Sequence, residues 1–245
     1  MNNPISGALY LFKGFKLIRQ PGIRQFVIIP LMINTLLFAI AGYLLMGWFG
    51  GFIDELVMGL PEWAQWLEWL IWPLVAAALL LLVYFTFTIV ANFISAPFNG
   101  VLSESVETHI TGIKKEDDSP WHTAITGIIP ALKEEGRKLF YSLTRSLPFL
   151  ILFFIPVVNL VAMPLWLLFG AWMLAIQYCD YPMANHNIEF NNQRALLKQR
   201  RFLAMGFGGA VLIGLMIPIV NFFVLPCAVA GATAMYLDHY KKLND

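Results

Sequence analysis

Residues 19–26 carry groups that can bind an oxyanion. Pro21 and Gly22 end one helical pattern, and a long apolar helix starts beside Arg24, so backbone N–H groups and a guanidinium are expected to lie together. Residues 1–53 contain no acidic side chain. Sulfate has no proton to donate at neutral pH and a carboxylate would repel it. A site made only of donors therefore favours sulfate or does not discriminate among oxyanions.

A second interpretation of this region stays open. Lys13, Lys16, Arg19 and Arg24 form a basic cluster next to an apolar segment. Such clusters commonly fix membrane topology and lie beside anionic lipid headgroups. From charge alone, this interpretation is the stronger of the two.

Other kinds of chemistry find little support. The four histidines are scattered, and none belongs to a zinc or nucleophile motif. The chain has no glycine-rich phosphate loop for ATP hydrolysis and no basic stripe for nucleic acid. Cys179 and Cys227 are expected to be packing residues rather than a disulfide. No enzymatic activity, metal site or cofactor is therefore predicted.

The distribution of charge predicts a membrane protein. Hydrophobic residues make up 59% of the 245 residues and charged residues 13%, about half the usual charged share of a soluble protein. Residues 25–53, 69–103, 146–179 and 202–237 contain no Asp, Glu, Lys or Arg. Each of these stretches exceeds the roughly 20 residues that a membrane-spanning helix needs. The predicted fold class is therefore an all-α integral membrane protein.

The charges between these stretches predict a topology. Residues 1–25 hold four basic and no acidic residues, whereas residues 54–68 hold four acidic and no basic ones. The positive-inside rule then places the N-terminus in the cytoplasm and the first loop outside. Residues 104–145 and 180–201 carry six and four basic residues and so also favour the cytoplasm. We therefore interpret 26–50 and 71–94 as long transmembrane helices.

A repeated motif indicates two helical hairpins. IPVVNLVAMP starts at Ile155 and IPIVNFFVLP at Ile217, and in each copy a proline and an asparagine interrupt an apolar stretch. Both copies are interpreted as hairpin tips, in hairpins over 146–179 and 202–237 that enter from the cytoplasmic side. The arm over 146–155 would rise only about 15 Å as a helix, half of a bilayer core. Full crossings in a thinned bilayer remain an alternative.

The remaining segments are predicted to be amphipathic helices at the membrane surface. One covers residues 1–25, and others lie within 98–145 at the cytoplasmic side. Within the latter region, Ser119 and Pro120 signal a helix start. No linker or low-complexity tract divides the chain, so residues 1–245 are predicted to form a single membrane domain.

Four segments resemble the CysZ family of bacterial sulfate transporters. They are QPGIRQFVIIPLMIN at 20–34, ANFISAPFNGVLSE at 91–104, FGAWMLAIQYCDYPMANH at 169–186 and CAVAGATAM at 227–235. The resemblance implies two long spanning helices, two partly penetrating hairpins and a homo-oligomer. It also implies sulfate uptake across the inner membrane for cysteine synthesis, without an ATPase subunit. It places the sulfate site at Gly22, Ile23 and Arg24, with Gln25 beside them where some relatives have a second arginine.

Neutral donors are the candidates for the path beyond that site, because fixed N–H and O–H groups must replace the water shell of the anion. Asn34, Asn92 and Asn99 meet that need, although each could instead link helices through hydrogen bonds. The sequence as a whole predicts a sulfate permease that contacts membrane lipid and binds no nucleic acid. Whether it is channel-like or ion-coupled stays open. The alternative is a membrane scaffold that transports nothing.

Overall fold

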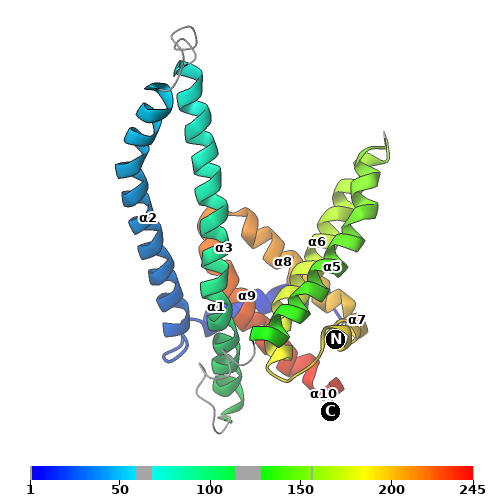
Figure 1. The fold of residues 1–245 in the computed structure, drawn as a ribbon. Helices are drawn as coiled ribbons and strands as arrows, with labels where there is room; N and C mark the ends of the chain where they lie inside the picture. The colour runs from blue at the N-terminus through cyan, green and yellow to red at the C-terminus, as the bar shows by residue number, and fades with distance from the viewer. Residues whose placement is uncertain (1, 59–67, 114–127, 156, 245) are drawn as a thin grey trace. The chain divides into compact units, whose positions relative to one another are not determined.

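The computed structural model describes residues 2–58, 68–113, 128–155 and 157–244, with most of their side chains. Within these ranges the chain forms helices and turns and no strand (Figure 1). The all-α fold class is therefore confirmed. By packing, Met1–Val27 and Pro97–Asp245 form one compact unit and Ile28–Ala96 a second. The single membrane domain expected from the sequence stays a prediction.

Two long helices supply the smaller unit. Helix α2 covers Gln25–Met58 and α3 covers Glu68–Thr111, so the predicted spans 26–50 and 71–94 lie within them. The two helices run in opposite directions (Figure 1). The large apolar side chains described on Ile28–Ala96 are mostly exposed. An apolar helix without protein neighbours around it needs lipid or another subunit to cover it.

Helix α3 continues where the sequence suggested a separate amphipathic helix. It runs without a break from its apolar part to Thr111. The amphipathic pattern nevertheless has a clear meaning, because Leu102 and Val106 are buried in the core of the larger unit. The change of pattern marks a change of surroundings rather than a helix end. The predicted helix start at Ser119 and Pro120 lies outside the described residues.

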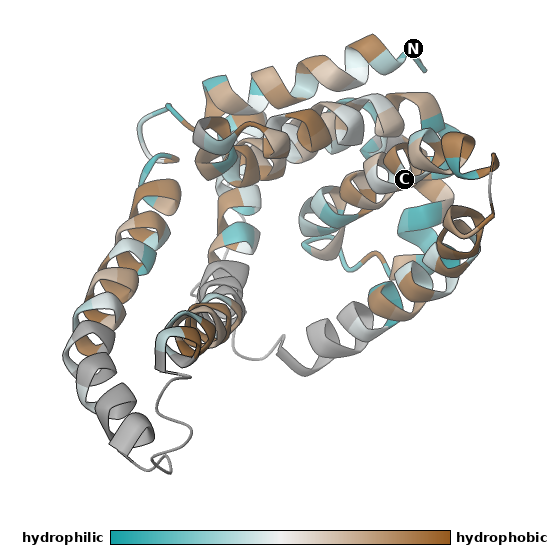
Figure 2. Ribbon diagram, turned by 90° about the horizontal axis from the view of Figure 1, so that it is seen from above, coloured by the Kyte–Doolittle hydropathy of each residue, from teal (hydrophilic) through white to brown (hydrophobic). Residues whose placement is uncertain are grey.

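The first helix packs tightly against the last hairpin. Helix α1, Pro4–Leu17, is capped by Asn3, whose side-chain oxygen accepts a hydrogen bond from the Ile5 N–H at 2.9 Å. Hydrophobic and hydrophilic residues are interspersed along it (Figure 2). A Cβ added at Gly14 would overlap the carbonyl oxygen of Cys227 in the second arm of that hairpin. Only glycine therefore allows this approach of α1.

Both copies of the repeat lie at turns between antiparallel helices. Helices α5, Ile128–Phe153, and α6, Asn159–Ala184, lie side by side in the first hairpin (Figure 1). Helices α8, Arg201–Met216, and α9, Pro218–His239, form the second. The prediction of two hairpin tips is confirmed, whereas their depth in a bilayer stays a prediction. Helices α7, Phe190–Gln199, and α10, Lys241–Asn244, complete the larger unit.

The first arm of the α5–α6 hairpin is longer than expected. The sequence suggested an arm beginning at residue 146, but α5 already begins at Ile128 and continues past Arg145. Only the part after Arg145 is uncharged, so the tip reaches about 15 Å beyond the last charged residue of that arm. The tip asparagines, Asn159 and Asn221, are exposed and make no side-chain hydrogen bond with the described residues.

Candidate functional site

The predicted anion site is a turn held in place by one buried side chain. Gly22 has φ of +90°, a left-handed conformation that a side chain would strain. Ile23 is 2% exposed and belongs to the core of the larger unit, whereas Arg24 and Gln25 are exposed. Gln25 begins α2. The turn therefore presents a guanidinium and a helix start to the surroundings while Ile23 anchors it.

The backbone of this turn offers fewer donors than the sequence suggested. The N–H groups of Ile23 and Arg24 both donate to the carbonyl oxygen of Gln20, at 3.1 and 3.2 Å. The N–H groups of Gly22 and Gln25 have no hydrogen-bond acceptor among the described residues. The N–H groups of Phe26 and Val27, next along α2, already donate to backbone carbonyls at 3.0 and 3.1 Å, so the backbone could contribute only these two groups to anion binding.

Some of the basic side chains near the turn contact other residues, and one does not pair with an acidic residue. Lys13 forms an ion pair with Asp238 at 2.7 Å, and the guanidinium of Arg19 lies 4.0 Å from the ring centre of Phe15. Arg24 has no acidic partner in the described part of the chain. Arg24 is thus the cation best placed to meet an anion at the turn.

The three predicted path residues have different surroundings. Asn34 is half-buried in α2 and lies in the smaller unit. Asn92 belongs to α3, and its side chain is outside the described part of the structure. Asn99 is 7% exposed in the larger unit, where its amide donates to the Tyr181 hydroxyl at 3.2 Å. Its amide thus links α3 to α6, and a place on the transport path stays a prediction.

A charged cluster that sequence reasoning did not assemble lies at the end of α3. The Glu107 carboxylate contacts Lys241 Nζ at 2.9 Å and His186 Nε2 at 3.0 Å. Burial acts to raise the pKa of Glu107, but the hydrogen bond from Lys241 and the nearby cations outweigh it, so the pKa lies below its usual value. Nothing in the sequence singled out Glu107. Its partners are 79 and 134 residues away, beyond the reach of any local pattern.

A buried ion pair links the two arms of the α5–α6 hairpin, and a hydrogen bond from Gln193 connects it to α7. Lys138 Nζ donates to Asp180 at 2.8 Å, and the two side chains are only 7% and 17% exposed. Gln193 donates to the other oxygen of Asp180, also at 2.8 Å. The QYCDYP segment that carried the family resemblance contains Asp180, but Lys138 and Gln193 gave no signal in the sequence.

Neither cysteine takes part in a disulfide. Cys179 and Cys227 are both buried and free. Among the described residues, no three His, Cys, Asp or Glu side chains are grouped as a metal site would require.

The described helices define a class of protein. Gln25–Leu44, Asn159–Ala184 and Val220–His239 are each long and apolar enough to cross a bilayer. Only 6% of the apolar stretch within Gln25–Leu44 is buried, so its apolar surface needs lipid or another subunit to cover it. This is an all-helical membrane protein.

Comparison with known proteins identifies the family. Residues 10–226 match the family described as Sulfate transporter CysZ/Etoposide-induced protein 2.4. The chain is 47% identical to a sulfate transporter CysZ of Pseudomonas syringae pv. tomato, over 95% of this chain and 92% of the relative. It is 48% identical to one of Pseudomonas paraeruginosa, over 95% of each. The chain therefore belongs to this family, as the resemblance predicted, and a family named for transport points away from enzymatic activity.

Proposed function

We propose that the chain is a sulfate permease that takes up sulfate across the bacterial inner membrane for assimilation into cysteine. The observation that carries this proposal is the 47–48% identity, over 95% of the chain, to relatives named sulfate transporter CysZ. The all-donor turn at residues 22–25 supports it independently. The protein acts as a multi-pass homo-oligomer without an ATPase subunit, and the exposed apolar faces of α2 and α3 supply surface for lipid and for further subunits.

Each residue of the turn has a separate role in binding sulfate. Gly22 adopts the left-handed conformation that reverses the chain, and Ile23 holds the turn against the core. Arg24 provides the positive charge, and Gln25 provides an N–H at the start of α2. A single guanidinium suits a transporter, because a site that bound sulfate very tightly would release it too slowly.

The path beyond the turn uses neutral donors. Asn34, Asn92 and Asn99 supply amide groups that can replace water around the anion without adding fixed charge. Asn99 already donates to Tyr181, so its contribution requires that amide to exchange partners. We assign no residue to the coupling of sulfate transport to another ion.

Substitution of Arg24 tests the site. Arg24→Ala removes the guanidinium and should weaken sulfate binding by about 1.5 to 3 kcal/mol, or about 10- to 150-fold. Arg19→Ala is the matched control, because it removes a neighbouring cation that stacks on Phe15. Sulfate affinity of the purified protein and sulfate flux into vesicles should fall together in Arg24→Ala only. Unchanged sulfate affinity in Arg24→Ala would contradict the proposed binding site. Absence of sulfate flux through the wild-type protein would contradict the proposed permease function.

Cysteine labelling tests the topology. In a protein whose two cysteines are replaced by alanine, Glu62→Cys should react with an impermeant thiol reagent from outside the cell. Asn192→Cys, on an exposed position of α7, should react only after the membrane is opened. Labelling of Asn192→Cys from outside would contradict the cytoplasmic placement of the loop between the two hairpins.

A further inference from the structure

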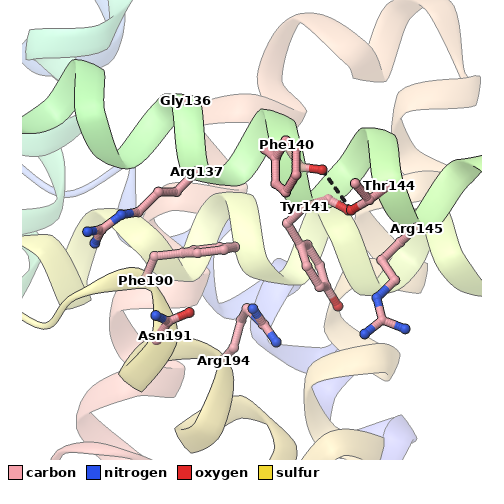
Figure 3. A pocket seen from close by; sticks show the side chains of 9 residues that line it. All are labelled: Gly136, Arg137, Phe140, Tyr141, Thr144, Arg145, Phe190, Asn191 and Arg194. Carbon is pink, nitrogen blue, oxygen red and sulfur yellow. Dashed lines mark hydrogen bonds between the residues drawn. The ribbon is translucent and has the colours of Figure 1, made fainter.

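A second cationic site lies apart in sequence from the anion-binding turn. A pocket of about 560 Å³ separates α5 from α7 within the larger unit (Figure 3). Six of its lining residues come from α5 and three from α7. They are Gly136, Arg137, Phe140, Tyr141, Thr144, Arg145, Phe190, Asn191 and Arg194. Three arginines in one pocket, with no acidic side chain among the lining residues that the structure describes, make it a site for an anion.

The three guanidinium groups differ in their contacts with neighbouring side chains. Arg194 lies between Arg137 and Arg145 in Figure 3, with its guanidinium 4.2 Å from the ring centre of Tyr141. Its Nε is buried and has no hydrogen-bond partner. Arg145 is exposed and has no acidic partner in the described ranges. Arg137 approaches Glu189 only at 3.8 Å, with both side chains exposed, so that pair is weak.

This arrangement suits a phosphate group. A guanidinium presents several N–H donors in a plane and binds phosphate oxygens in pairs. The Tyr141 ring beneath Arg194 restricts the freedom of that side chain and so lowers the entropy cost of binding.

The position of the pocket along α5 favours a lipid over a free ion. Arg145 is the last charged residue before the uncharged stretch 146–179. Phe140 lines the pocket and is 71% exposed, and Leu143 and Leu147 are exposed on the same helix toward its apolar end. Acyl chains could cover these side chains while a headgroup occupies the pocket.

We propose that this pocket binds the phosphate group of an anionic phospholipid at the surface of the membrane. The proposal depends on the membrane placement of the α5–α6 hairpin and does not depend on sulfate transport. Bound lipid would link α5 to α7 through Arg145 and Arg194, and so stabilise the packing of the α5–α6 hairpin against α7.

Lipid binding to the purified full-length protein tests the proposal. Phosphatidylglycerol and zwitterionic phosphatidylcholine are added separately to delipidated protein in detergent, and bound lipid is counted by native mass spectrometry. Arg145→Gln with Arg194→Gln should weaken binding of phosphatidylglycerol by about 10- to 30-fold, the effect of two surface cations, and leave phosphatidylcholine unchanged. Lys198→Gln removes an exposed cation of α7 outside the pocket and is the matched control.

Two further arms separate the possible results. Arg145→Gln alone, at an exposed position, should show a partial loss of phosphatidylglycerol even if the double variant folds poorly. Sodium sulfate and sodium phosphate are titrated against the same proteins to test a free oxyanion. An unchanged preference for phosphatidylglycerol in both variants would overturn the proposal. The proposal would also be overturned if free phosphate or sulfate bound to the wild type but not to the double variant, and the wild type showed no preference for phosphatidylglycerol.

Discussion

Substituting the aspartate in two similar ion pairs should lower the free energy of unfolding by very different amounts. Asp180 and Asp238 each accept from a lysine, at 2.8 and 2.7 Å. The Asp180 pair is 17% and 7% exposed, whereas the Asp238 pair is 39% and 44% exposed. The same substitution, Asp→Asn, keeps the shape of both sites and removes one charge from each. Burial is therefore the main difference between the two experiments.

The expected magnitudes follow from solvation of the lysine that remains. Asp180→Asn leaves Lys138 charged inside the protein, and breaking a buried pair in this way costs about 3–5 kcal/mol. Asp238→Asn leaves Lys13 in contact with solvent, so its cost should be about 0–1 kcal/mol. With about 2–4 °C per kcal/mol for a chain of this size, Asp180→Asn should lower Tm by about 6–20 °C.

Thermal unfolding in detergent, followed by circular dichroism, measures both variants. Replacing Lys138 with Met in the Asp180→Asn background should recover part of the lost stability, because it removes a buried charge that has lost its ion pair with Asp180. Equal shifts of Tm in the two aspartate variants would refute the assignment of this effect to burial. A loss below about 1 kcal/mol in Asp180→Asn would show that water or another group stabilises the Lys138 charge.

Two other substitutions test the packing and the charged cluster. Because the folded-state pKa of Glu107 is depressed, its contribution to stability is complete above its ordinary pKa, about 4.5, and is lost as the pH falls through the lower folded value. Glu107→Gln should cost about 1.5–3 kcal/mol at pH 7 and flatten the loss of Tm below that pH; an unchanged acid profile would contradict this role. Gly14→Ala should cost about 1–3 kcal/mol by forcing α1 from α9, whereas Gly209→Ala, with open space around its Cβ, should be neutral or stabilising. Similar Tm values for the two glycine variants would show that α1 shifts without cost.

Local signals in the sequence were sufficient where a residue type fixes the backbone. Pro21 and Gly22 predicted the break between α1 and α2, and the repeat predicted both hairpin tips. These signals act within a few residues, because proline lacks an N–H and glycine tolerates a positive φ. The same logic failed for α3, where the hydrophobic period changes but no residue ends the helix.

Contacts between distant segments could not be derived from the sequence. Lys138 and Asp180 are 42 residues apart, and nothing in the periodicity of either helix indicates that they meet. The turn at residues 20–25 shows the same limit on a smaller scale. The sequence indicated free donors beside Arg24, but the Gln20 carbonyl oxygen occupies two of them because the chain curls back within the turn. Which groups face one another depends on tertiary packing, and a single sequence does not encode it locally.

The unbroken course of α3 couples the length of its apolar part to the direction in which the side chains of that part face. Each residue of an α-helix turns the following side chains by about 100°. One residue inserted in the apolar part of α3 would turn the preceding side chains of that part about the helix axis, while Leu102, Ser103 and Val106 keep their buried positions. Seven inserted residues would restore the face to within about 20°. Relatives that adapt to bilayers of different thickness should therefore change this helix by whole heptads, or not at all.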